Sequence, residues 1–350
     1  MPLGSPIVLG FGLWCGLTWF GGGSGERAGL VAKNFADSLL DAVGKKRVPA
    51  CVGIDPVYAR LPSEISENPE LNDESDSEVA LDALREFCRR TIRIVSPHVA
   101  AVKLNIAFFE RYYADGIFTY YELVEEAANL GLIVIGDVKR GDVGHTAEMY
   151  ARSALGDPDF SDLDNLVAPD AVTINGYLGL DGVQPFVDVA SNEGKGVFVL
   201  VRTSNPSAAA LQDAKLEDGK TVCELLAQQV EEWATGDGLV GECGYSCVGA
   251  VVGARGREET MKLRAMMPHC LFLVPGWGAQ GASPEDVAAC FKSDGTGALV
   301  CASRSIIYAY DEEVAGMKYV EMYPSEWDKC IEQACKDFVA EIAKLAAATA

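Results

Sequence analysis

The feature that most constrains the fold is a repeated alternation of short apolar runs with amphipathic segments. Eight apolar runs have the length of a strand, and they cover residues 49–54, 99–104, 132–136, 171–174, 196–201, 247–252, 271–274 and 298–301. Segments with helical periodicity separate them, among them residues 79–95, 120–129, 147–155, 221–234 and 284–291. Uninterrupted apolar runs are typical of parallel strands that helices cover on both faces. The sequence therefore predicts an α/β protein with a parallel sheet.

The number of strand–helix units distinguishes two ways of building that sheet. Eight units are what a closed (β/α)8 barrel, the TIM barrel, contains. The alternative is an open, doubly wound sheet, which typically carries a glycine-rich fingerprint after its first strand. Residues 53–62 after the first run read GIDPVYARLP and do not match that fingerprint. We therefore predict a (β/α)8 barrel.

The first 31 residues differ from the rest of the chain. Residues 2–23 are apolar, aromatic and rich in glycine, but no Lys or Arg precedes them. A secretory signal begins with a positive segment, and a membrane span has a longer core with fewer glycines. We expect residues 1–31 to be a poorly ordered extension, with a targeting or anchoring role as the alternative. Residues 32–350 are predicted to form one barrel domain, with the helical segment 327–346 on its outside.

The net charge and the cysteine content limit which partners and which cellular compartment the sequence predicts. A formal net charge of −22 argues against nucleic acid and against anionic membranes, because both need a basic surface. The eleven cysteines are odd in number and scattered through apolar or helical stretches, which is typical of reduced thiols in a cytoplasmic protein. No cysteine or histidine spacing predicts a metal site, and no cofactor is expected.

Residues 131–146, GLIVIGDVKRGDVGHT, carry an unusual cluster of charge. The apolar run ends at Gly136, and Asp137, Lys139 and Asp142 follow within six positions. Side chains alternate along a strand, so Asp137 and Lys139 should face the same side, and Asp142 could swing back past the turn. These charges are costly to desolvate unless they serve one another or a ligand. A structural ion pair is the alternative to a functional cluster.

Polar residues also follow the other apolar runs, where the carboxyl ends of barrel strands carry chemistry. These residues are Asp55, Lys103, Asn105, Asn175, Arg202, Thr203, Ser204, Asn205, Ser303 and Arg304. The seventh run leads into PGWGAQG at 275–281, whose glycines leave backbone N–H groups unobstructed. Arg304 follows the eighth run. Barrels commonly bind phosphate at their last two loops, so we predict a phosphate site there.

Taken together, these motifs resemble the orotidine 5′-phosphate decarboxylase family, in its longer bacterial-type branch. The resemblance extends from about residue 32 to residue 310. It rests on GIDP (53–56), VKLNIAFFE (102–110), DVKRGDVGHT (137–146), VTINGYLG (172–179), FVLVRTSNP (198–206), VPGWGAQG (274–281) and SRSI (303–306). The Asp-x-Lys-x-x-Asp element is shared with a sugar-phosphate decarboxylase of the same superfamily, whereas RTSNP together with PGxGAQG is specific.

The resemblance implies cofactor-independent decarboxylation of orotidine 5′-phosphate to uridine 5′-phosphate in pyrimidine biosynthesis. It implies four catalytic residues, which are Lys103, Asp137, Lys139 and Asp142. The implied substrate-binding residues are Asp55, Thr146, Asn175, Thr203, Ser204, Gln280, Gly278, Ser303 and Arg304. It also implies a homodimer in which Asp142 and Thr146 reach the partner's site. Two alternatives stay open, a magnesium-dependent sugar-phosphate decarboxylase and a catalytically silent barrel that only binds a nucleotide or sugar phosphate.

Overall fold

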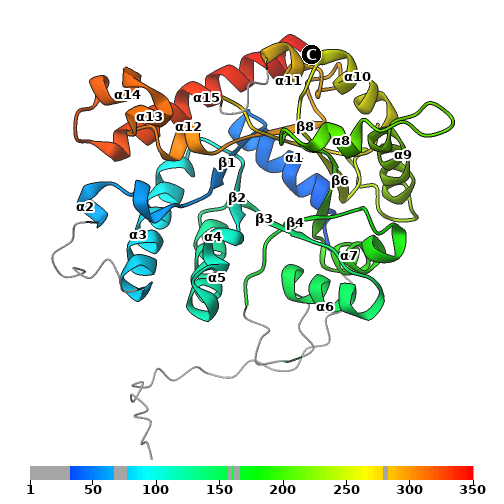
Figure 1. The fold of residues 1–350 in the computed structure, drawn as a ribbon, viewed down its shortest axis with the longest axis horizontal. Helices are drawn as coiled ribbons and strands as arrows, with labels where there is room; N and C mark the ends of the chain where they lie inside the picture. The colour runs from blue at the N-terminus through cyan, green and yellow to red at the C-terminus, as the bar shows by residue number, and fades with distance from the viewer. Residues whose placement is uncertain (1–31, 67–76, 157–159, 161–165, 279–282, 350) are drawn as a thin grey trace, which may run out of the picture. The chain divides into compact units, whose positions relative to one another are not determined.

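The computed structural model describes residues 32–66, 77–156, 160, 166–278 and 283–349. Eight parallel strands close into a barrel in sequence order, with helices around them (Figure 1). The strands are β1 (Ala50–Ile54), β2 (Ala101–Asn105), β3 (Ile133–Arg140), β4 (Ala171–Ile174), β5 (Gly196–Arg202), β6 (Val248–Val252), β7 (Phe272–Pro275) and β8 (Ala298–Ala302). Pairing of β1 with β8 closes the sheet. The predicted (β/α)8 barrel is confirmed, and the open sheet is excluded.

Helices surround the barrel, and most of them connect one strand to the next (Figure 1). The longer ones are α1 (Phe35–Lys46), α3 (Ser77–Val95), α5 (Tyr113–Asn129), α6 (Gly144–Leu155), α7 (Leu180–Glu193), α9 (Val222–Ala234), α10 (Arg257–Met266) and α15 (Trp327–Thr349). The shorter ones are α2 (Ser63–Ser66), α4 (Ala107–Glu110), α8 (Ala208–Gln212), α11 (Pro284–Ala288), α12 (Arg304–Ile307), α13 (Glu312–Ala315) and α14 (Met317–Met322), with a 3-10 turn at Tyr58–Arg60. The last helix, α15, packs on α3, α11 and α12, so it covers the seam between β8 and β1.

The described residues from Ala32 onward form one compact unit. The expectation for residues 1–31 lies outside the described part of the chain. Within that part, no helix is both long and apolar enough to cross a membrane.

The helix α1 lies at the amino-terminal ends of β5 and β6. Phe35 packs edge-on against Phe198 of β5, with ring centroids 5.8 Å apart. Asp37 accepts hydrogen bonds from the backbone N–H groups of Glu242 and Cys243, just before β6. The amino-terminal end of the barrel is thus covered by α1. The polar side chains gather at the other end, where the strands have their carboxyl ends.

The strand β3 is longer than its apolar run. The run stops at Gly136, but the strand continues to Arg140, so Asp137 and Lys139 lie within it. Its pairing with β4 shifts register between Gly136 and Arg140. A β-bulge of this kind redirects side chains, and such bulges are frequent next to functional sites.

Candidate active site

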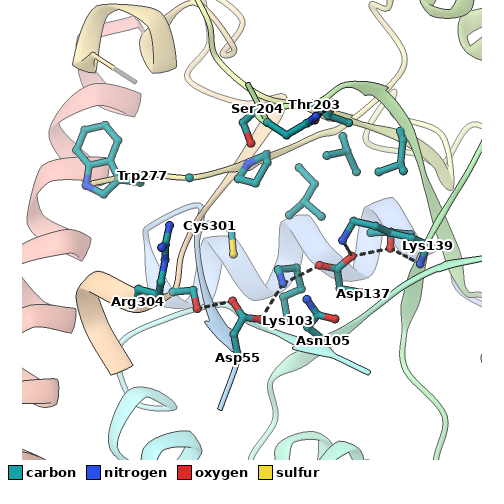
Figure 2. A pocket seen from close by; sticks show the side chains of 18 residues that line it. Asp55, Lys103, Asn105, Asp137, Lys139, Thr203, Ser204, Trp277, Cys301 and Arg304 are labelled. Carbon is teal, nitrogen blue, oxygen red and sulfur yellow. Dashed lines mark hydrogen bonds and ion pairs between the residues drawn. The ribbon is translucent and has the colours of Figure 1, made fainter. Parts of the chain in front are cut away.

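A cavity of about 450 Å³ opens at the carboxyl ends of the strands. Eight of the predicted site residues line it, and they are Asp55, Lys103, Asp137, Lys139, Thr203, Ser204, Ser303 and Arg304 (Figure 2). Apolar side chains, including Leu200 and Val251, line the cavity as well. Concave sites of this kind, with a few convergent polar groups, are typical ligand sites.

A row of alternating charges crosses one wall of the cavity (Figure 2). The Nζ atom of Lys103 lies 2.9 Å from Oδ2 of Asp137 and 3.5 Å from Oδ1 of Asp55. The Nζ atom of Lys139 donates to the other Asp137 oxygen, Oδ1, at 2.6 Å. The Asp137 carboxylate is thus held between two ammonium groups.

The two lysines differ in how far their side chains are buried. Lys103 and Asp137 are buried, whereas the side chain of Lys139 is 51% exposed to the cavity. Burial acts to raise the pKa of Asp137, but Lys103 and Lys139 outweigh it and hold that pKa well below its usual range. Burial likewise acts to lower the pKa of Lys103, but Asp55 and Asp137 outweigh it and raise that pKa. Asp137 and Lys103 therefore stay charged at neutral pH, and neither can readily exchange a proton.

Thr173 of β4 completes this row, and the sequence analysis missed it. Its hydroxyl donates to Oδ1 of Asp137 at 2.8 Å and accepts the backbone N–H of Lys139 at 3.0 Å. Its only sequence signal is its position two residues before Asn175, inside an apolar run. A threonine in a strand is an ordinary β-former, so this signal is weak.

Asp55 anchors the next part of the site, across the seam of the barrel. Ser303 donates to its Oδ2 at 2.5 Å, and the Tyr308 hydroxyl donates to its backbone oxygen at 2.9 Å. The other carboxylate oxygen, Oδ1, is buried without a hydrogen bond from any described residue. It is paired with the Lys103 ammonium, 3.5 Å away, and an ionised carboxylate can only accept further hydrogen bonds.

Arg304 lies beside Trp277, on the Asp55 side of the cavity and away from Lys139 (Figure 2). It begins α12, is exposed, and forms no ion pair with a described residue. The loop after β7 contains Gly276 and Gly278, both with positive φ, and only Gly276 of the two lines the cavity. Gln280 lies outside the described residues.

The buried Arg202 is a different kind of arginine. Its guanidinium lies 2.6 Å from Asp213 and 3.1 Å from Glu259. Arg202 is not among the residues that line the cavity. Arg304 is therefore the arginine that the cavity offers to an anion.

Of the described site residues that the sequence predicted, four do not line the cavity of this chain, Gly278 and the three that follow. The Asp142 carboxylate accepts the N–H of Val143 at 2.8 Å, and the ion pair of Lys139 is with Asp137, so the expected swing of Asp142 back past the turn is not seen within this chain. Thr146 is exposed in the first turn of α6. Asn175 accepts the N–H of Tyr177 at 2.9 Å and turns its side chain into the following loop.

The fold and this row of charges define the class of protein, a (β/α)8 barrel with its ligand site at the carboxyl ends of the strands. A model of the orotidine 5′-phosphate decarboxylase / HUMPS family matches residues 51–319. The chain belongs to this family, which confirms the resemblance drawn from its motifs.

Relatives and solved structures agree with this assignment. The orotidine 5′-phosphate decarboxylase of Caldicellulosiruptor bescii is 40% identical over 282 residues, which are 80% of this chain and 92% of that protein. That of Rhodopirellula baltica is 39% identical over 302 residues, covering 86% and 96%. The structure of Leishmania donovani OMP decarboxylase superimposes with a TM-score of 0.64 at 29% identity, covering 89% of this chain and 98% of that one.

The charged row predicts how stability depends on pH. Replacing Lys103 by Met leaves Asp137 buried beside one lysine instead of two, and we expect a loss of about 3 kcal/mol in the free energy of unfolding at pH 7. A depressed carboxyl pKa stabilises the fold above its unfolded value and loses this effect as pH falls. The loss in the Lys103→Met variant should therefore persist from pH 7 to about pH 4 and shrink only below that, where Asp137 of the folded variant takes up a proton before that of the wild type, as measured by urea unfolding at pH 7 and at about pH 3.

A surface lysine provides the control for this experiment. Lys33 pairs with Asp41, and both side chains are more than half exposed. Lys33→Met should change the urea midpoint little at either pH, because exposed pairs contribute little. An equal loss at both pH values for Lys103→Met would contradict a buried, ionised Asp137.

Proposed function

We propose that this protein decarboxylates orotidine 5′-phosphate to uridine 5′-phosphate without a metal or an organic cofactor. The observation that carries the proposal is the half-exposed Lys139 ammonium, 2.6 Å from a buried carboxylate and facing the cavity. Membership of the family and the names of relatives at 40% and 39% identity support the same reaction.

Lys139 supplies the chemistry of this proposal. When the bond from C6 to the carboxylate breaks, CO₂ leaves and the electron pair stays on C6. A fixed ammonium beside C6 stabilises this charge as it develops. Lys139 then donates a proton to C6 and recovers one from solvent. Asp137 and Lys103 stay charged throughout, so they hold the field around Lys139 constant.

The remaining cavity residues bind the substrate. Asp55 accepts hydrogen bonds from the ribose hydroxyls with support from Ser303, and Thr203 and Ser204 face the pyrimidine ring. Arg304, after β8, holds the phosphate together with Gly278 of the loop after β7. Gln280, which lies outside the described residues, bridges the base and the phosphate in this proposal, as the family resemblance implies. Asn175, at the end of β4, would contact the substrate only if its side chain left its hydrogen bond with the Tyr177 N–H. Phosphate binding energy far from C6 can orient the ring and exclude water, so it contributes to the rate as well as to affinity.

Asp142 and Thr146 act in the site of a second copy in this proposal. They lie amid exposed apolar side chains on α6 and around the start of α7, which pack side by side (Figure 1). These side chains are Val143, Met149, Tyr150, Tyr177, Leu178 and Leu180. Grouped apolar exposure of this kind marks protein interfaces. A homodimer across this face would bring a partner's Asp142 toward Lys139.

We also assign the protein to the cytoplasm. The ten cysteines in the described part of the chain are free thiols, and nine of them are buried. This state fits a reducing compartment.

The reaction can be tested by following the pyrimidine absorbance with purified protein. We expect turnover of orotidine 5′-phosphate that excess EDTA leaves unchanged, because Lys139 supplies the positive charge that a metal would otherwise provide. Turnover that EDTA abolishes and magnesium restores would favour the sugar-phosphate decarboxylase alternative. Binding of uridine 5′-phosphate with no turnover would identify a silent barrel.

The phosphate assignment predicts the effect of Arg304→Ala. We expect a higher KM and a kcat/KM lowered about 100-fold, or roughly 3 kcal/mol, because a remote anion anchor stabilises the transition state. Arg257→Ala is the matched control, since Arg257 is exposed on α10 and lies outside the cavity. Wild-type kcat/KM in the Arg304 variant would refute the assignment.

The shared site predicts complementation between two inactive variants. Lys139→Ala and Asp142→Ala should each be nearly inactive as homodimers. In a heterodimer, two-fold symmetry places both lesions in one site and leaves the other intact. After subunit exchange about half of the dimers are mixed, so roughly a quarter of wild-type activity should return in a steady-state assay.

A matched mixture controls for this result. Lys139→Ala mixed with Asp137→Asn should show no recovery, because both residues act within their own barrel and each site keeps one lesion. No recovery in the Asp142 mixture, once exchange is confirmed by mass spectrometry, would rule out the shared site.

A further inference from the structure

Thr173 of β4 lies opposite the β-bulge in β3. Gly136 pairs with Val172 and Arg140 pairs with Ile174, so three residues of β3 lie opposite Thr173 alone. Lys139, the last of these three, has a φ of 45°, in the left-handed region that residues other than glycine rarely adopt. The backbone at Lys139 therefore needs a specific partner to hold it.

Three hydrogen bonds join Thr173, Asp137 and Lys139 in a closed ring. The Lys139 backbone N–H donates to Oγ1 of Thr173 at 3.0 Å, and Thr173 donates to Oδ1 of Asp137 at 2.8 Å. The Lys139 ammonium donates to the same oxygen at 2.6 Å. An N–H can only donate, so the hydroxyl accepts there and its single proton is directed to Asp137. The ammonium of Lys139 thus contacts Oδ1 of Asp137 directly, and its main-chain N–H is linked to the same oxygen through the Thr173 hydroxyl.

We infer that Thr173 is a positioning residue that aims the Lys139 ammonium at the reacting carbon, an inference that rests on the proposed function. Asp137 is the one ion-pair partner of that ammonium among the described residues, and the side chain is half exposed. Without the hydroxyl, the Lys139 N–H loses its acceptor and the bulge can relax, which moves the ammonium. Misplacement of a catalytic group by about 1 Å can lower a rate roughly 100-fold.

Two substitutions separate the hydroxyl of Thr173 from its methyl group. Thr173→Val keeps the shape without the hydroxyl, and we expect kcat to fall roughly 100-fold while KM changes less than about threefold. Affinity for uridine 5′-phosphate should also be kept, because the product lacks the carboxylate that breaks away beside Lys139. Thr173→Ser keeps the hydroxyl and should restore most of kcat. If Thr173 acted only by packing, the order of kcat would be reversed: Thr173→Val would keep the wild-type kcat and Thr173→Ser would lower it.

Thr91→Val is the matched control. Thr91 is a buried threonine on α3 whose hydroxyl has no hydrogen bond with a described residue. Its loss should leave kcat and KM unchanged. If Thr173→Val fails to bind uridine 5′-phosphate, Thr173→Ala and Thr173→Ser still differ by the hydroxyl alone. The Ser variant should then turn over at least about tenfold faster, given the cost of misalignment.

The outcomes keep the two proposals apart. No turnover by the wild-type protein would refute the proposed function. Wild-type turnover together with an unimpaired kcat in Thr173→Val, or equal rates in the Ala and Ser variants, would overturn the role of Thr173 alone.

Discussion

Asp137 carries a charge almost removed from water, and burying one ionised group is costly unless opposite charges surround it. Lys103 of β2 and Lys139 of β3 each hold one of its oxygens. This arrangement requires the β2–β3 register that sets Asn105 opposite Asp137. A shift by one residue would turn Lys103 to the other face of the sheet. The same ion pairs therefore specify strand register and create the field in which Lys139 acts.

Closure of the barrel joins a second part of the site that is far apart in sequence. Ser303 and Asp55 are separated by 248 positions, yet they form a short hydrogen bond. Tyr308 ties the same seam by donating to the Asp55 backbone and accepting the N–H of Val57. The Asp55 carboxylate is thus oriented only when β1 and β8 have paired. Binding a ligand there should stabilise the closed barrel, since a ligand that binds only the folded state favours it.

The sequence predicts those parts of the structure that local patterns encode. Apolar runs mark the eight strands, and charge at their ends marks the rim that lines the cavity. The extent of β3 does not follow from apolarity, because Asp137 and Lys139 remain in the strand by pairing with each other across a bulge. Thr173 carries no distinguishing signal until β4 places it opposite that bulge. Alternation also ends at the turn before Asp142, so it could not fix where that carboxylate points.

The acidity of the chain explains why one free arginine matters. A net charge of −22 repels an anion at long range, but salt screens this field over about 8 Å at physiological ionic strength. Affinity for a phosphate must then come from groups in direct contact with it. Arg202 cannot serve, because Asp213 and Glu259 already neutralise it. Arg304 has no such partner among the described residues, so its charge remains available to a ligand at the end of the cavity away from Lys139.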